Sequence, residues 1–135
     1  MRVLFVCKGN VARSQMAEAF FNKFSKKNKA ISAGADPGVH LGNAVGEYKE
    51  LARCMKDIGL DISHKKSKQL TKEMVEKVDK VISLVDKRLL PDYVKKSKKL
   101  EIYFVEDPDG KDYEFHCKVR DQIKDYVKKL VKKFG

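Results

Sequence analysis

Four short apolar runs, each bounded by polar or turn-forming residues, recur along the chain. Three of them are rich in apolar β-branched and aromatic residues, a composition that is typical of buried strands, and Ala30-Ile31-Ser32 is read as a further short strand. The predicted strands cover residues 2–6, 30–32, 81–85 and 102–105. The first of them leads directly into Cys7-Lys8-Gly9-Asn10, whose glycine and asparagine predict a turn.

Between these runs, apolar residues recur at the three- and four-residue spacing of amphipathic helices. The long predicted helices cover residues 13–24, 43–58 and 113–134. Gly59 predicts a C-cap for the second helix, and Thr71 predicts an N-cap for a further short helix. Residues 34–42 contain three glycines and a proline, which predicts a loop.

Strands and helices alternate along the chain, and this order predicts an α/β fold. The expected architecture is a small four-stranded parallel sheet with helices on both faces, joined by right-handed crossovers. In such folds ligands bind at the carboxyl ends of the strands. Cys7 follows the first strand, Ser32 ends the second and Asp107 follows the fourth, so we expect these residues to gather at one edge. No linker or repeat interrupts residues 1–135, which predicts a single domain.

The chain is strongly basic, with 30 Lys+Arg against 19 Asp+Glu and a formal net charge of +11. The excess lies in lysine pairs spread along the sequence, not in one basic arm. No zinc-finger or RNA-binding spacing accompanies it. A solvated, lysine-rich surface is therefore preferred over a nucleic-acid partner, and its positive field would steer a small anion or a phosphorylated partner to a site.

Three further observations bear on the compartment. With 42% hydrophobic residues the chain can bury a core, and its longest apolar run, Val3–Cys7, is too short to cross a bilayer. No signal-peptide pattern follows Met1. Three cysteines are an odd and small number for a disulfide-stapled secreted domain. We therefore expect a cytoplasmic protein with no membrane partner.

The candidate chemistry lies between the first strand and the first helix, in the pattern Cys7-x5-Arg13. This motif is weak alone, but here inward-facing N–H groups and a helix N-terminus would form an anion cradle. Such a field favours the thiolate of Cys7, to which Ser14 can donate, and Arg13 can offer two parallel donors to an oxyanion. The candidate anion-binding residues are Lys8, Gly9, Asn10, Val11, Ala12, Arg13 and Ser14. The simpler interpretation makes Cys7 a core thiol and Arg13 a surface residue.

The run VLFVCKGNVARSQMAEAF resembles the low-molecular-weight protein tyrosine phosphatase superfamily, which includes the thioredoxin-type arsenate reductases. The similarity continues through residues 31–34, 59–63, the Asp107-Pro108 pair and residues 119–123, so it covers nearly the whole chain. The loop and the distant Asp-Pro pair together make the resemblance highly specific.

The resemblance implies a role for three residues. Cys7 would attack phosphorus, and Arg13 would clamp the transferring group. Asp107 would protonate the leaving oxygen and then activate the water that cleaves the thiophosphate. Asp109 and Glu106 are alternative acids, but the proline that follows Asp107 restricts its backbone and favours it.

The resemblance also implies supporting residues. Asn10, Ser14 and Ser32 match positions that hydrogen-bond and shape the loop. Asn10, Glu18, Ser32 and Asp61 resemble a monovalent-cation site of some arsenate reductases, although Glu18 and Asp61 would equally serve as solvated or capping carboxylates. No cofactor is predicted, and the three histidines lack paired metal-ligand spacing.

The chain departs from both branches of this superfamily. Thioredoxin-coupled arsenate reductases carry two further cysteines beyond the third strand, whereas residues 83–89 contain none here. Cys54 lies on the apolar stripe of its helix, which predicts a core position. Cys117 falls opposite the stripe of the last helix, which predicts exposure and leaves open a role as a resolving thiol.

The aromatic slot of a tyrosine phosphatase is also poorly matched. Lys8 stands after the nucleophile, where many such phosphatases have an apolar residue, and Asp109 stands where many have tyrosine. Tyr48 and Tyr113 are the remaining candidates for the walls of the pocket.

Since the catalytic residues suffice for hydrolysis but not for the three-cysteine relay, the sequence favours a phosphomonoesterase. It would act through a cysteinyl-phosphate intermediate on a phosphorylated protein or a small aryl phosphate. The alternative is an arsenate reductase that uses the same loop and an external thiol donor, and residues 13–17 and 34–42 lean toward that branch. A non-catalytic anion- or nucleic-acid-binding module is a distant third interpretation.

Overall fold

Four parallel strands form the central sheet, in the order β2-β1-β3-β4. The computed structural model describes residues 1–134. Its strands are β1 (Arg2–Cys7), β2 (Lys29–Gly34), β3 (Lys80–Ser83) and β4 (Leu100–Ile102). The predicted four-stranded parallel sheet is confirmed, with β1 between its two neighbours.

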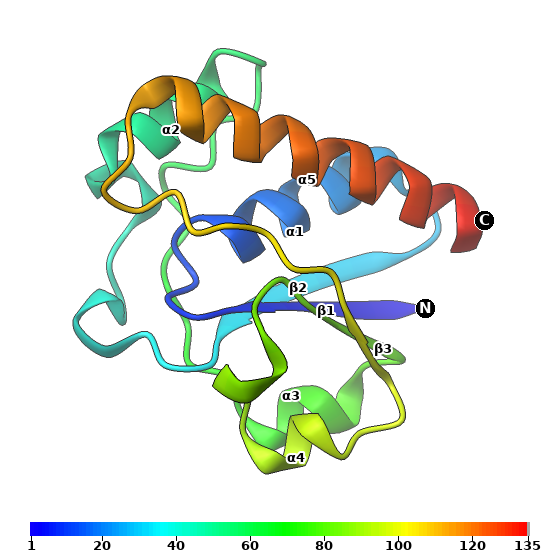
Figure 1. The fold of residues 1–135 in the computed structure, drawn as a ribbon. Helices are drawn as coiled ribbons and strands as arrows, with labels where there is room; N and C mark the ends of the chain where they lie inside the picture. The colour runs from blue at the N-terminus through cyan, green and yellow to red at the C-terminus, as the bar shows by residue number, and fades with distance from the viewer. Residues whose placement is uncertain (135) are drawn as a thin grey trace.

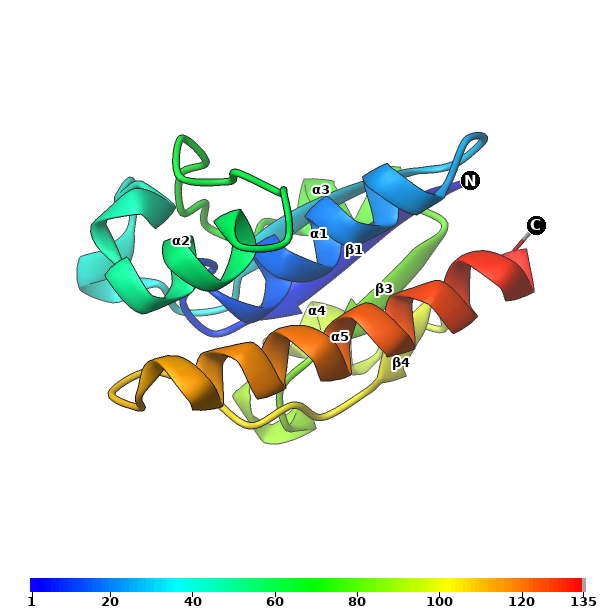
Figure 2. The same cartoon turned by 90° about the horizontal axis from the view of Figure 1, so that it is seen from above.

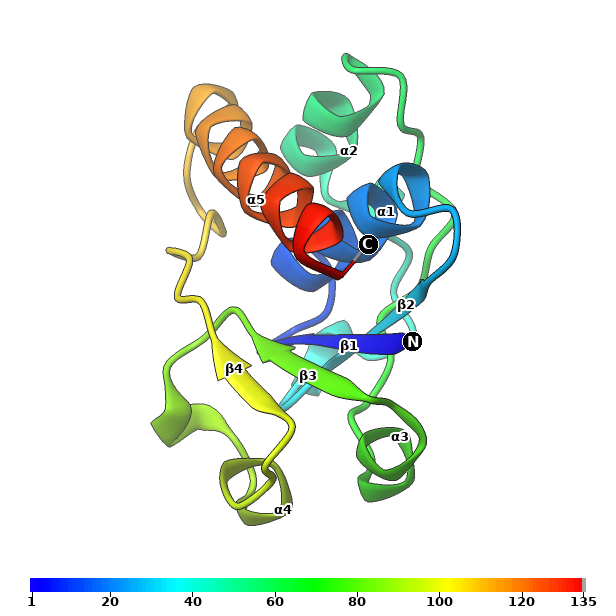
Figure 3. The ribbon, with the colours of Figure 1, turned by 90° about the vertical axis from the view of Figure 1, so that its right-hand side faces the viewer.

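Helices cover both faces of the sheet, as predicted (Figure 1). One face carries α1 (Arg13–Phe24), α2 (Lys49–Lys56) and α5 (Tyr113–Phe134). The other face carries the short helices α3 (Lys72–Lys77) and α4 (Asp92–Lys95) (Figure 3). From above, α5 runs beside α1 and begins next to α2 (Figure 2). Within the described part of the chain, no helix is long and apolar enough to cross a membrane.

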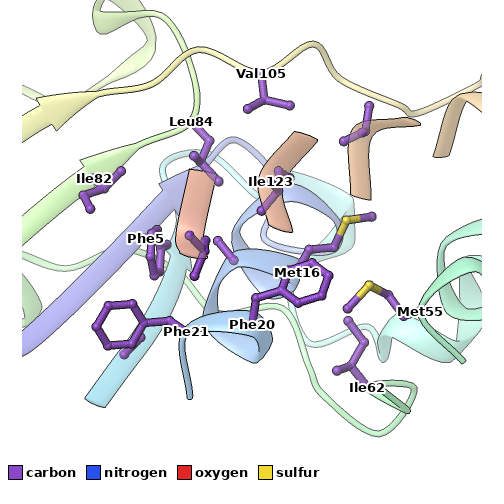
Figure 4. Packing of buried hydrophobic residues seen from close by; sticks show 14 of the residues in the cluster. Phe5, Met16, Phe20, Phe21, Met55, Ile62, Ile82, Leu84, Val105 and Ile123 are labelled. Carbon is purple, nitrogen blue, oxygen red and sulfur yellow. The ribbon is translucent and has the colours of Figure 1, made fainter. Parts of the chain in front are cut away.

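Two apolar clusters, one on each face, hold the helices against the sheet. Side chains of β1 alternate between the clusters because successive residues of a strand point to opposite faces. Val3 and Phe5 enter the cluster beneath α1 and α5, where the rings of Phe5 and Phe21 meet edge to face at 5.9 Å (Figure 4). Leu4 and Val6 enter the cluster above α3 and α4. Because both faces are covered, β1 is continuously apolar.

Helix α2 is much shorter than the apolar spacing predicts, because it starts at Lys49 and not six residues earlier. Residues 43–47 run beside residues 63–67 and form backbone hydrogen bonds with them. The Val45 N–H, for example, donates to Lys65 O at 2.8 Å. These long-range bonds leave room for only one 3-10 turn, at Val45–Glu47, in place of the predicted start of the α-helix.

The segment after β4 leads the chain along the sheet to its carboxyl edge. Strand β4 begins and ends earlier than predicted, but residues 103–105 remain extended beside the end of β3. The Tyr103 N–H donates to Ser83 O at 2.8 Å, and the Val105 N–H donates to Leu84 O at 3.0 Å. This extension brings the following residues to the carboxyl edge of the sheet.

Candidate active site

A cavity of about 290 Å³ lies at the carboxyl edge of the sheet, beside the ends of β1 and β2 and the segment after β4. It is lined by residues 7–13 after β1, by residues 36–40 after β2, and by Asp107 and Asp109 after β4. In Figure 1 this edge lies opposite the labelled N-terminus. The structure therefore brings most of the sequence-predicted residues together, whereas Ser14 and Ser32 lie buried behind the cavity.

The loop after β1 turns its carbonyl groups outward. The Cys7 carbonyl oxygen accepts from the Ala35 N–H at 2.8 Å, and the Lys8 carbonyl oxygen accepts from the Asp36 N–H at 3.0 Å. The Gly9 carbonyl oxygen accepts from the Ser67 hydroxyl at 2.7 Å, and that of Asn10 accepts from the Gln15 amide at 3.3 Å. Asn10 supports this turn with a φ of 55°, in the left-handed region that asparagine tolerates. With the carbonyl groups paired on the outside, the N–H groups of the loop other than that of Asn10 are left for an anion.

Cys7 is buried at the end of β1, and its sulfur has two hydrogen-bond partners. The Ser14 Oγ lies 2.9 Å from Sγ, and the Asn10 N–H donates to Sγ at 3.3 Å. Hydrogen bonds donated to sulfur stabilise negative charge on it. Cys7 thus lines the cavity with two polar partners at its sulfur.

Arg13 is buried, in contrast to the interpretation that makes it a surface residue. Its Nη1 donates to Val105 O at 2.9 Å, so the extension after β4 fixes the guanidinium. Its Nη2 lies 3.6 Å from Asp107 Oδ2. A guanidinium held in this way at the cavity wall can stabilise charge on a bound oxyanion.

Two of the three candidate acids reach the cavity. Asp107 and Asp109 line it, and the Asp109 N–H donates to Asp107 Oδ1 at 3.0 Å. Glu106 is exposed and does not line the cavity. Only Asp107 forms an ion pair with Arg13 among the described residues, which places its carboxyl beside the oxyanion position.

The four residues that resemble a cation site do not gather into one. Asn10 donates to Ser32 Oγ at 3.0 Å, and Ser32 donates to Glu18 Oε1 at 2.9 Å. Asp61, by contrast, is exposed and accepts hydrogen bonds from Ser63, which lower the pKa of its carboxyl. Within residues 1–134, no cluster of three His, Cys, Asp or Glu side chains could hold a metal ion.

The rim of the cavity contains His40, which the sequence places in the loop near the expected site but which is not among the candidate site residues. His40 lines the cavity, and its Nδ1 lies 2.6 Å from the Tyr48 hydroxyl. Neither predicted aromatic wall lines the cavity, because Tyr48 holds His40 and Tyr113 packs on Arg53 at 4.0 Å. Residues 34–42 show no hydrophobic periodicity. Their glycines and proline predict a loop, but no feature of the sequence indicates that this loop borders the cavity.

The two other thiols lie in the apolar cluster beneath α5. Burial raises the pKa of the Cys54 thiol to about 12, with a smaller contribution from Cys117. Cys117 is half-buried against this cluster, so the expectation of an exposed position is wrong. Among the described residues, Cys7 is the only thiol that lines the cavity.

Comparison with known proteins gives relatives in both branches. The chain is 34% identical to the glutaredoxin arsenate reductase of Synechocystis sp. over 137 residues, which cover 99% of this chain and 98% of the relative. It is 32% identical to arsenate reductase 2 of Staphylococcus haemolyticus, over 90% of this chain and 89% of that protein.

Solved structures of both kinds share the fold. A low molecular weight protein tyrosine phosphatase from T. tengcongensis matches with a TM-score of 0.85 and 32% identity, over 98% of this chain and 99% of that one. An arsenate reductase in its oxidized state matches with a TM-score of 0.80 and 32% identity, over 99% and 98%. Residues 2–135 match the family described as low molecular weight phosphotyrosine protein phosphatase, and the chain therefore belongs to that family.

Proposed function

We propose that the protein is a Cys7-dependent arsenate reductase that takes its reducing equivalents from an external thiol. The observation that carries this proposal is the cavity itself, which is small and charged and has no phenylalanine, tyrosine or tryptophan among its lining residues. Such a site suits an inorganic oxyanion better than an aryl phosphate. The arsenate reductases among the relatives support the same choice.

The first step of the reaction would be attack of the Cys7 thiolate on arsenic(V). A sulfur–arsenic bond forms and an arsenic–oxygen bond breaks, while Asp107 gives a proton to the departing oxygen, which leaves as water. Arg13 and the N–H groups of the loop stabilise the negative charge on the remaining oxygens.

The second step needs a thiol from solution. An external thiol attacks Cys7 Sγ, and the electron pair of the sulfur–arsenic bond passes to arsenic, which leaves as arsenite. A second external thiol then cleaves the mixed disulfide and restores Cys7. The net reaction consumes arsenate and two thiols and yields arsenite, one disulfide and water. The need for a donor outside the chain agrees with the name of the Synechocystis relative.

Hydrolysis of phosphomonoesters is the second candidate function. The phosphatase from T. tengcongensis supports it, and Cys7, Arg13 and Asp107 would suffice for it. In this reaction, water activated by Asp107 would cleave the cysteinyl-phosphate, so no second thiol would be required.

The experiment compares both reactions in one preparation. Arsenate-dependent oxidation of glutathione, with glutaredoxin present, would be followed beside hydrolysis of p-nitrophenyl phosphate. We expect arsenate turnover that disappears in Cys7→Ser and persists in Cys117→Ala. Phosphate release without arsenate turnover would overturn the proposal in favour of hydrolysis.

A further inference from the structure

Glu18 is a buried carboxylate whose charge is compensated from a distant part of the sequence. It lies on α1 and is 5% exposed. Its Oε2 lies 3.1 Å from the Nζ of Lys65, 47 residues further along the chain. A carboxylate at this depth requires a partner charge, because its removal from water is costly.

Lys65 contributes a positive charge beside Glu18, and its side chain contributes little to the packing of the core. Its side chain is 40% exposed, and Glu18 is its ion-pair partner. Lys68 is the other lysine that faces this carboxylate: burial lowers the pKa of its ammonium, and the charge of Glu18 partly offsets that effect. Lys68 forms no ion pair with Glu18, whereas its backbone N–H donates to Asn10 Oδ1 at 2.9 Å.

From Glu18, hydrogen bonds run without interruption to the nucleophile. The carboxylate accepts the Ser32 hydroxyl hydrogen, so the oxygen of Ser32 is left to accept from Asn10 Nδ2 at 3.0 Å. The same Asn10 nitrogen donates to Ser14 Oγ at 2.7 Å. The orientation of the Asn10 amide is fixed because its Oδ1 faces a backbone N–H, which can only donate.

The direction of the last bond follows from the ionised form of Cys7. An amide nitrogen can only donate, so the oxygen of Ser14 accepts from Asn10. Because a thiolate has no hydrogen to donate, the Ser14 hydroxyl is the donor to an ionised Cys7 Sγ, 2.9 Å away. A hydroxyl that donates to sulfur stabilises the thiolate over the thiol.

We propose that Lys65 is a positioning residue for Cys7. Its ammonium compensates the charge of Glu18, and Glu18 in turn holds Ser32 and Asn10 so that Ser14 donates to the sulfur. Loss of Lys65 leaves either a less compensated negative charge near the thiolate or a protonated carboxyl, which accepts more weakly from Ser32 and can itself donate to it. Both outcomes disfavour the thiolate. The inference rests on Cys7 as the nucleophile of the proposed function.

The test measures Cys7 without any substrate, so its result is independent of the reaction that the enzyme catalyses. Alkylation of Cys7 by iodoacetamide would be followed by mass spectrometry across the acidic to neutral range. The charged groups that line the cavity with Cys7, which are Lys8, Arg13, Asp36, His40, Asp107 and Asp109, are unchanged in every variant.

We expect Lys65→Gln to slow alkylation by about tenfold, the size of a hydrogen bond to a charged group. Lys66→Gln is the matched control: it removes one positive charge from the adjacent exposed residue and should alkylate like the wild type. Lys65→Arg keeps the charge and should restore most of the rate. Thermal unfolding of each variant would establish that the fold is retained.

A double variant separates the proposed route from a direct charge effect. If Lys65 acts through Glu18, adding Lys65→Gln to Glu18→Gln should change the alkylation rate no further. An additive loss, or a Lys65→Gln protein that alkylates with the wild-type pH profile, would overturn the proposal. Should Lys65→Gln fail to fold, the comparison of Glu18→Gln with the double variant still decides between these outcomes.

Discussion

Asp107 and Arg13 form an ion pair of very unequal exposure. The side chain of Asp107 is 53% exposed and that of Arg13 is 7% exposed, with 3.6 Å between the charged atoms. A pair of this length at the surface contributes little to stability. The pair holds the carboxyl at the wall of the cavity, where the leaving oxygen would emerge in the proposed reaction.

The first prediction concerns this carboxyl. Asp107→Asn should lower kcat roughly 100-fold, because it removes proton transfer while it leaves the anion loop intact. Asp109→Asn is the control, since Asp109 lines the same cavity but has no ion pair with Arg13. Steady-state kinetics of both variants would check this, and a larger loss in Asp109→Asn would assign the acid to Asp109.

The second prediction concerns pH and stability. Burial raises the pKa of Cys54 from 9.0 to about 12 and that of Tyr126 from 10.0 to about 12. Both groups bind their protons more tightly in the folded than in the unfolded state. Their contribution to the free energy of unfolding is therefore fully present below their ordinary pKa values of 9.0 and 10.0. The free energy of unfolding should therefore fall as the pH rises from 9.0 toward 12.

Urea unfolding on both sides of pH 9.0 would measure this loss. Cys54→Ala removes one of the two groups, and its free energy of unfolding should depend less steeply on alkaline pH. The slopes are compared, because the cavity left by the lost sulfur lowers stability at every pH. Equal slopes in both proteins would contradict the raised pKa of Cys54.

At the scale of elements, the end of β2 shapes the anion loop. A Cβ at Gly34 would lie 2.6 Å from the Lys8 carbonyl oxygen, closer than packed atoms allow. Gly34→Ala should therefore push the loop away from its position, lower stability by about 1–3 kcal/mol, and slow the alkylation of Cys7.

Gly42→Ala provides the comparison for this variant. A Cβ there meets no atom within 4 Å, and its only penalty is the backbone strain of a φ of 82°. We expect it to leave the reactivity of Cys7 unchanged. Melting temperature and alkylation rate, measured on both variants, would show whether the steric contact of Gly34 matters.

Local sequence patterns predict elements whose contacts are local. The β1 strand and the loop that follows could be predicted, because the apolar run and the turn residues lie next to each other. Residues 43–47 could not, because their partners at residues 63–67 are distant in the chain. The ion pair of Glu18 and Lys65 could not be predicted for the same reason, because the two residues are distant in the chain and no sequence pattern connects them.

At the scale of the whole molecule, the net charge is +11, and most of the charged residues lie outside the cavity. Charges spread over the surface attract anions from a distance but do not stabilise the transition state. For an anionic substrate, kcat/KM should therefore fall as salt is added while kcat stays constant. Kinetics in a series of sodium chloride concentrations would measure this, and a constant kcat/KM would exclude electrostatic steering.

The position of Cys7 as the one thiol that lines the cavity among the described residues also determines how the protein would recover from oxidation. A thiolate exposed to peroxide becomes a sulfenic acid, which survives only if another thiol captures it before further oxidation. With no second thiol lining the cavity among the described residues, that capture depends on molecules from solution. The donor that completes each turnover would then also be the agent of repair, and the working life of the enzyme would follow the supply of reduced thiol around it.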